Sequence, residues 1–245
     1  MSWFFTLFYQ PIYNLLVFTY DTIPGADVGV AIIAVTVIVK LVTYPLTYKS
    51  LKSQKELQEI QPKIEELKEQ YKDDKEKLGK EMMALYAEHK VNPMASCLPL
   101  LIQLPIFIAL YQVMRDGLGA VKTEALYTFI QNPGTIHQVF LGVIDLTKTS
   151  IPLAILAGLA QYLQAKVMMA RRPPKVVRKE EPAKDEDMLA QMNRTMLYFM
   201  PAMTIFLGST SLPGGVMLYW CATTLLTFAM YKWALRNKAS DPEKK

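Results

Sequence analysis

The sequence predicts an all-α membrane protein with a core of five transmembrane helices, a cytoplasmic antiparallel helical hairpin and an N-terminal interfacial helix. Hydrophobic residues make up 51% of the chain and gather in blocks. Several blocks approach the length of about 20 residues that a helix needs to cross a bilayer. Most lysines and arginines lie in only three of the segments between these blocks. A soluble domain built around a single core does not need this pattern.

The predicted elements follow one another without a gap larger than a turn. In chain order they are an interfacial amphipathic helix with an outer linker (1–27), a first span (28–46), the cytoplasmic hairpin (47–96), a second span (97–117), an extracytoplasmic loop (118–150), a third span (151–169), a cytoplasmic loop (170–195), a fourth span (196–211), a fifth span (215–231) and a cytoplasmic tail (232–245).

The distribution of positive charge predicts the orientation of these spans. Of the 27 lysines and arginines, 23 lie in the segments 46–96, 166–195 and 232–245. Short loops rich in lysine and arginine remain in the cytoplasm. We therefore expect a multi-pass protein with its N-terminus outside and its C-terminus in the cytoplasm. The net charge of +5 reflects this topology, and it does not indicate sequence-specific nucleic-acid binding.

The first twenty residues are rich in aromatic side chains and contain no lysine or arginine. Gln10, Pro11 and Asn14 interrupt the aromatic run, which favours a helix lying in the outer interface. A sixth span is the alternative, and the charge distribution does not decide between them because this segment carries no positive charge.

A helical apolar rhythm runs through the charged segment between the first two spans. Its apolar positions form two short heptad seams, Leu57, Ile60, Ile64, Leu67, Tyr71 and then Leu78, Met82, Leu85, His89. The sequence predicts an antiparallel hairpin with Pro62 kinking its first arm. We expect Ile60, Ile64, Leu78 and Leu85 to hold a surface on which a partner or substrate docks. A solvated spacer is the alternative.

Lys40 is the only lysine or arginine within the first predicted span. At about 1.5 Å per residue it lies roughly 16 Å into a hydrocarbon core about 30 Å thick. The neighbours that share its helix face are polar, namely Thr36, Thr43, Thr47 and Tyr44. A cation on such a face indicates a hydrated groove inside the protein. The alternative is snorkelling, in which the side chain carries its ammonium to the nearer headgroups.

Two further spans carry small and polar residues on single faces. In the third span these are Ala157, Gly158, Gln161, Gln164 and Ala165, and in the fifth they are Trp220, Thr223, Thr224 and Thr227. Each stripe alone is also typical of a helix-packing face. Together with Lys40, the stripes favour a shared polar cavity.

No pattern of residues indicates catalysis, a metal or a cofactor. His89 and His137 fall in loops on opposite sides, the two cysteines lie far apart, and the sequence has no phosphate-binding glycine-rich loop. We therefore expect a protein that is not an enzyme and needs no cofactor.

Several motifs resemble the YidC family of membrane protein insertases, and the similarity runs from Trp3 to about Trp233. The most specific pieces are Lys40-Leu-Val-Thr-Tyr-Pro-Leu-Thr47, Gln61-Pro-Lys-Ile64, Glu81-Met-Met-Ala-Leu-Tyr86 with Val91-Asn-Pro93, Leu98-Pro-Leu-Leu-Ile-Gln-Leu-Pro-Ile-Phe107, and Leu212-Pro-Gly-Gly-Val-Met-Leu-Tyr-Trp220. The sequence resembles a short bacterial form, without the large extracytoplasmic domain and the long basic tail of other members.

The resemblance implies a groove that is open to the cytoplasm and to lipid but closed toward the outside. It implies that Lys40 occupies the position of the family's basic groove residue, usually arginine, and that Gln164 and Trp220 line the same groove. Lysine keeps the charge but lacks the planar, five-donor guanidinium.

The resemblance also implies a protein of the bacterial plasma membrane that inserts small membrane proteins, helps them fold and translocates their short polar tails. The expected partners are nascent membrane proteins, the lipid bilayer, the ribosome and the Sec translocon, with no small-molecule substrate. The alternative is a transporter for small molecules or ions that binds an anion at Lys40. The hairpin between the first two spans has no later counterpart, whereas transporters commonly contain internal repeats. A simple ribosome tether is less compatible with the neutral hairpin and short tail.

Overall fold

The computed structural model describes residues 3–23, 25, 27–92, 94, 98–116, 121–169 and 195–239. The elements in chain order are η1 (Phe5–Tyr9), α1 (Gln10–Thr22), α2 (Val28–Glu59), α3 (Gln61–Gln70), α4 (Lys75–Glu88), α5 (Leu98–Asp116), η3 (Thr123–Ala125), β1 (Val139–Phe140), β2 (Ile144–Asp145), α6 (Ile151–Met169), η4 (Thr195–Phe199), α8 (Met200–Thr210) and α9 (Gly214–Ala239). Residues 170–194 of the predicted loop 170–195, and residues 240–245 of the predicted tail, lie outside the described residues.

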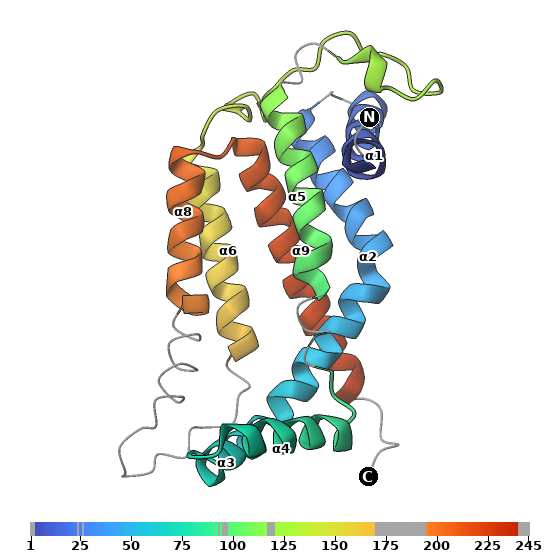
Figure 1. Cartoon of the computed structure of the whole chain (residues 1–245). Coiled ribbons are helices and arrows are strands. Elements are labelled where there is room, and N and C mark those ends of the chain that lie inside the picture. The colour runs from blue at the N-terminus through green and yellow to red at the C-terminus, as the bar shows by residue number, and fades with distance from the viewer. Residues whose placement is uncertain are drawn as a thin grey trace.

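The long helices form a bundle with α9 in its centre. Helix α9 packs against α2, α5 and α6, and α8 packs against the far side of α6 (Figure 1). Helix α1 lies at one end, beside the segment that carries η3 and the β1–β2 ribbon, and the α3–α4 pair lies at the other end (Figure 1). We call these the α1 end and the hairpin end.

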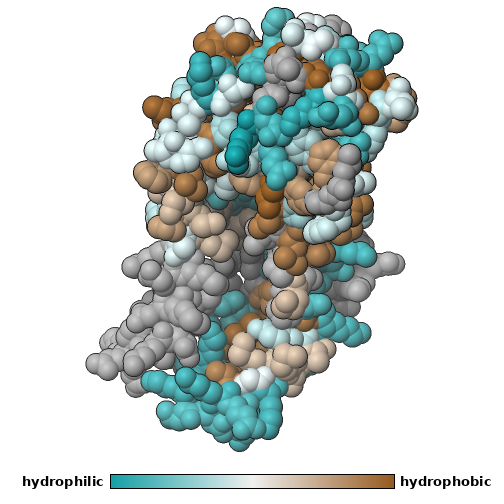
Figure 2. Space-filling view, turned by 45° about the horizontal axis from the view of Figure 1, so that its top comes forward, coloured by the Kyte–Doolittle hydropathy of each residue, from teal (hydrophilic) through white to brown (hydrophobic). Residues whose placement is uncertain are grey.

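Among the described residues, three helices are long and apolar enough to cross a membrane: Val28–Leu57, Ile151–Met168 and Gly214–Trp233. The second and fourth predicted spans correspond to α5, with 19 residues, and to η4 followed by the 11 residues of α8. On the face that Figure 2 shows, hydrophobic residues gather along the middle of the bundle, hydrophilic and hydrophobic residues mix at the α1 end, and the hairpin end is mostly hydrophilic. The all-α membrane class is confirmed, and the five-span count stays a prediction.

Helix α2 combines the first predicted span with the first part of the hairpin. It begins after Asp27, whose Oδ1 accepts hydrogen bonds from the N–H groups of Gly29 (2.7 Å) and Val30 (3.2 Å). This N-cap satisfies donors that the first helical turn cannot pair internally. The helix then runs for 32 residues, through Pro45. The helix therefore continues past residue 46 into the charged segment, and the end of the first span at that residue stays a prediction.

The kink expected at Pro62 is instead a break between two helices. Helix α2 ends at Glu59, Ile60 (φ −92°, ψ 0°) makes the turn, and α3 begins with Pro62 in its first turn. Proline is favoured at this position because its missing N–H would have no helical partner there. Asp74 then caps α4 by accepting the N–H of Lys77 at 3.0 Å.

The main core lies towards the α1 end. Most of its large, fully buried side chains come from α1, α2, α5 and α9, including Leu16, Ile32, Leu110 and Met217. Figure 1 shows α1 nearly end-on, so its axis crosses those of the long helices. A second, smaller core joins α3 to α4 through Ile60, Ile64, Leu85 and Val91. Of the four residues expected to hold the docking surface of the hairpin, Leu78 alone is not part of this cluster.

Close helix packing on the far side of α9 depends on Gly158. A Cβ atom at this position would lie 2.4 Å from a side-chain carbon of Ile205 and 3.0 Å from the backbone oxygen of Pro201. Helices α6 and α8 therefore approach closely, as small residues in membrane helices allow. This contact accounts for Gly158 in the third predicted span.

Candidate functional site

Lys40 lies partway along α2, on the side that is partly covered by the protein. Its side chain is partly buried, whereas the next two residues, Leu41 and Val42, are 66% and 73% exposed. The Lys40 ammonium makes no hydrogen bond or ion pair with any residue that the structure describes. A cation within a candidate membrane span is costly to bury, which makes Lys40 a candidate functional residue.

The threonines on the face of Lys40 use their hydroxyl protons within α2. Thr36 donates to the Ile32 carbonyl at 2.6 Å, and Thr43 donates to the Val39 carbonyl at 2.8 Å. The Thr47 hydroxyl donates to the Thr43 carbonyl at 3.0 Å. These hydroxyls retain acceptor lone pairs but cannot donate to an anion in this arrangement. Lys40 is therefore the charged donor on this face of α2.

The burial of these threonines differs along the face. Thr36 and Thr47 are 1% and 6% exposed, whereas Thr43 is half-buried like Lys40. One turn beyond Lys40, the ring of Tyr44 lies 6.2 Å from that of Trp233 on α9. The accessible part of this face of α2 is therefore the middle, at Lys40 and Thr43, and buried residues lie on both sides of it at Thr36 and Thr47.

The polar residues of the other predicted stripes lie on α6 and α9. Gln161 accepts the hydroxyl hydrogen bond of Thr204 from α8 at 2.7 Å, and Gln164 is half-buried. Trp220 packs edge-to-face on Phe107 of α5 with ring centroids 5.3 Å apart, and Thr224 is 5% exposed. Gln161 and Trp220 therefore lie at contacts between helices.

The structure does not connect these residues directly to Lys40. Among the described residues, no hydrogen bond, ion pair or ring contact joins Lys40 to Gln161, Gln164 or Trp220. Sequence reasoning also missed a link between α5 and α9, in which Gln103 donates to the hydroxyl of Tyr219. A glutamine in the apolar run 98–110 was the available signal, because polar side chains in such helices commonly pair across an interface.

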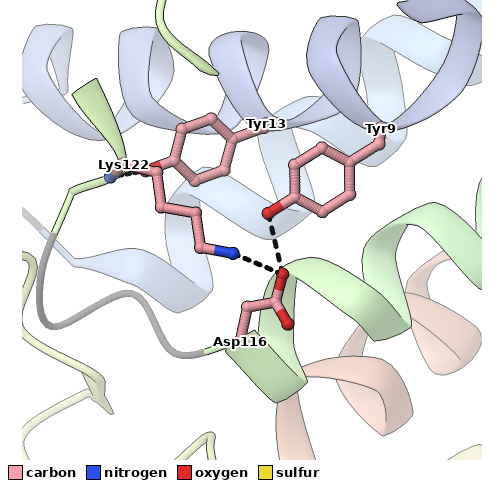
Figure 3. Close-up of polar contacts among 4 residues, drawn as sticks. All are labelled: Tyr9, Tyr13, Asp116 and Lys122. Carbon is pink, nitrogen blue, oxygen red and sulfur yellow. Dashed lines mark hydrogen bonds and ion pairs between the residues drawn. The ribbon is translucent and has the colours of Figure 1, made fainter. Parts of the chain in front are cut away.

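A second polar cluster lies at the α1 end (Figure 3). The Tyr9 hydroxyl donates to Asp116 Oδ2 at 3.1 Å, and the Lys122 ammonium binds the same oxygen at 2.7 Å. The backbone N–H of Lys122 donates to the Tyr13 hydroxyl at 2.7 Å. Burial and the hydrogen bond to Asp116 raise the pKa of Tyr9 to about 12, which keeps it a neutral donor. This cluster fixes α1 across the end of α5.

Among the residues that the structure describes, no group of histidine, cysteine or acidic side chains has the arrangement of a metal site. On its own face of α2, Lys40 has threonine hydroxyls and the Tyr44 ring as neighbours, and its ammonium is the only charge between Thr36 and Thr47. This arrangement can bind an anionic group by charge and hydrogen bonding, but it contains no nucleophile paired with a base.

Comparison with known proteins shows the family of the chain. The model of the 60Kd inner membrane protein family matches residues 18–241. A membrane protein insertase YidC from Pelobacter propionicus is 33% identical over 227 residues, which cover 93% of this chain and 38% of the relative. A membrane protein insertase YidC from Francisella tularensis subsp. novicida is 34% identical over 217 residues, which cover 89% of this chain and 34% of the relative.

The chain thus spans little more than a third of the length of these curated relatives. The family match nevertheless extends over nearly all of the chain and includes every long apolar helix described above. The chain therefore belongs to the 60Kd inner membrane protein family, the family of the YidC membrane protein insertases.

Proposed function

We propose that this chain is a membrane protein insertase that inserts small integral membrane proteins, helps them fold and translocates their short polar tails. Membership of the family and the names of its relatives support this function. The observation that carries the proposal is Lys40, a half-buried ammonium within α2 that has no polar partner among the described residues.

The proposed mechanism lowers the cost of moving charge through the bilayer. A single charged side chain costs about 2.5 to 3.5 kcal/mol at the centre of a membrane helix on insertion scales. In a hydrated groove beside α2, an acidic tail residue would pair with Lys40 on its way across. The threonine hydroxyls donate to their own helix, so Lys40 supplies the attraction. The apolar part of the substrate would then move into lipid, driven by burial of about 25 cal/mol per Å².

Five spans are proposed for the core, with α5 and the η4–α8 segment joining the three long apolar helices. The positive-inside rule supports a cytoplasmic hairpin end and an extracytoplasmic α1 end. Helix α1 has 13 residues and crosses the bundle axis (Figure 1), which supports an interfacial position. The charged hairpin would dock incoming nascent chains, with the ribosome and the Sec translocon as partners that deliver them.

Single-cysteine labelling tests this topology. Lys75→Cys in the hairpin and Thr135→Cys at the α1 end would be compared after Cys97 and Cys221 are replaced by alanine. A membrane-impermeant maleimide added to intact cells should label only the Thr135→Cys variant. After the cells are opened, it should label both variants. Labelling of Lys75→Cys in intact cells would refute the proposed orientation.

Reconstitution tests the activity itself. Liposomes with and without the purified chain would receive a newly synthesised single-span protein with an acidic tail, and protease protection of the tail would report translocation. We expect protection only in liposomes that contain the chain. Uptake of a labelled small anion without any tail protection would instead identify an anion transporter.

A further inference from the structure

The β1–β2 ribbon at the α1 end has an apolar side that the protein does not cover. Phe140 and Ile144 point inwards and pack against the main core. Between and beside them, Val139, Leu141 and Val143 are 42%, 68% and 83% exposed. We call these three residues the apolar turn. The segment 139–144 contains no polar or charged side chain at all, and such a surface is typical of a contact site.

The backbone of the apolar turn favours a contact function. The N–H of Val143 donates to the Phe140 carbonyl at 3.1 Å, and both residues between them have positive φ, 51° at Leu141 and 71° at Gly142. Glycine adopts this conformation freely, and asparagine and aspartate tolerate it better than other residues do. Leu141 is strained in this conformation, and because its side chain is exposed, packing within the turn does little to offset the strain. A contact of this side chain with a partner outside the protein would explain why leucine is present.

The apolar turn is fixed to the beginning of α2. The N–H of Leu141 donates to Asp27 Oδ2 at 2.7 Å, while Oδ1 of the same carboxylate caps the first turn of α2. The Phe140 ring lies so close to Gly29 that a Cβ atom there would be 2.0 Å from it. The apolar turn therefore lies at the level where the first candidate span begins.

We propose that the apolar turn inserts into the bilayer leaflet at the α1 end and sets the depth of α2. Lipid is the partner that fits, because a membrane helix beginning at Val28 places its first turn at the boundary between headgroups and acyl chains. Asp27 transmits this depth to the helix, since one carboxylate binds both the turn and the N-terminus of α2. Lys40 lies on that same uninterrupted helix, so the apolar turn also sets the depth of its ammonium.

Fluorescence quenching in liposomes tests the contact with lipid. An environment-sensitive fluorophore would be attached at Val143→Cys, in the chain whose Cys97 and Cys221 are replaced by alanine, with Thr135→Cys as the control on the same exposed segment. Lipids carrying a nitroxide near the headgroup should quench the label at position 143, and aqueous iodide should quench the label at position 135. Strong iodide quenching at position 143 would overturn the proposal. Protection from both quenchers would indicate contact with a second protein copy and would overturn it as well.

Leu141→Asn separates the lipid contact from the stability of the turn. Asparagine suits positive φ, so the melting temperature in detergent should stay unchanged or rise. In liposomes the same substitution should reduce nitroxide quenching at position 143 and increase iodide quenching.

The depth of α2 is tested with a label at Val42→Cys. In the Leu141→Asn chain this label should move towards the bilayer centre, which raises the ratio of quenching by deep over shallow nitroxide lipids. An unchanged ratio would refute control of α2 depth. None of these measurements requires insertase activity, so their failure is distinct from failure of the proposed function.

Discussion

The buried side chain of Asn14 on α1 accepts a hydrogen bond from the backbone N–H of Tyr127, 113 residues further along the chain, at 2.7 Å. Its amide nitrogen donates to the carbonyl of Ala125 at 2.8 Å. The side chain thereby acts as a peptide group would, pairing with the backbone on both sides of Leu126. These bonds attach the end of η3 and the residues after it to α1. The side chain of Asn14 thus makes the hydrogen bonds that a neighbouring strand would make in a sheet.

Asn14→Leu should destabilise the α1 end. Leucine has a similar volume but leaves the N–H of Tyr127 and the carbonyl of Ala125 without this partner, and each buried unsatisfied group costs about 1–3 kcal/mol. Denaturant unfolding in detergent would measure the loss. Gln10→Leu is the matched control, because Gln10 contributes a longer bond to Ala125, at 3.3 Å. Equal losses for the two variants would contradict this role of Asn14.

The charge of Lys40 should matter more than its shape. Lys40→Arg should insert substrates with acidic tails normally, whereas Lys40→Met should lose most of this activity. Coulomb attraction between unit charges 4 Å apart is about 4 kcal/mol at an effective dielectric constant of 20. Protease protection of acidic-tailed and neutral-tailed substrates in liposomes would measure the difference.

Neutral-tailed substrates provide the internal control for that experiment, since they should be least affected by Lys40→Met. Lys166→Met is the external control, because Lys166 is a lysine near the end of α6 rather than on the face of α2. At matched expression, the Lys40→Met variant and the unaltered chain could insert acidic tails equally well. That result would contradict the prediction and favour the alternative in which Lys40 snorkels to the headgroups.

The hairpin should depend on Ile64 and Leu85 more than on Leu78. The first two are 6% and 8% exposed within the α3–α4 cluster, whereas Leu78 is only partly buried and lies outside it. Full burial of such a side chain contributes about 1.5–3 kcal/mol. Ile64→Ser with Leu85→Ser should therefore make the hairpin sensitive to limited proteolysis, and Leu78→Ser should not. Undiminished insertion by the double variant would reduce the hairpin to a spacer.

Asp145 should make stability at the α1 end pH-dependent under acid conditions. Hydrogen bonds from the Thr147 side chain, followed by the interaction with Lys148, lower the pKa of Asp145 to about 2. An unfolded aspartate has a pKa of about 3.9. A carboxyl with a depressed folded pKa stabilises the fold above the unfolded value, and this contribution is lost as pH falls through the folded value.

The loss should therefore occur between pH of about 4 and about 2. Melting temperatures in detergent across this range would be compared with those of Asp145→Asn, which cannot titrate at this position. The difference in melting temperature between the unaltered chain and Asp145→Asn should become smaller as the pH falls. A constant difference would show that the ionised carboxylate contributes nothing. The neighbouring backbone contacts of Leu146 and Lys148 with the start of α9 are shared by both proteins.

Much of the helical architecture follows from local sequence. The apolar blocks predicted the long helices, and the apolar rhythm around Ile60 and Ile64 predicted a packed α3–α4 pair. These features depend on hydrophobic periodicity, which is repeated within a few turns and is therefore visible in the chain. The helix face of Lys40 is determined in the same way, because a helical period fixes which residues are neighbours.

Other features depended on partners distant in the chain. Sequence periodicity placed Thr36 and Thr224 on polar stripes, but only packing against neighbouring helices determined that both are buried. The bond between Gln103 and Tyr219, the contacts of Asn14 with the segment after η3, and the attachment of Leu141 to Asp27 all join residues that no local pattern relates.

The sequence by itself therefore determined the membrane class, the helices and the lone cation of the first span. The tertiary structure decided which polar groups are paired and which remain available, because hydrogen bonds and burial depend on what lies opposite a side chain. It also decided how the segment at the α1 end is held, since irregular backbone must find its partners in side chains such as Asn14 and Asp27.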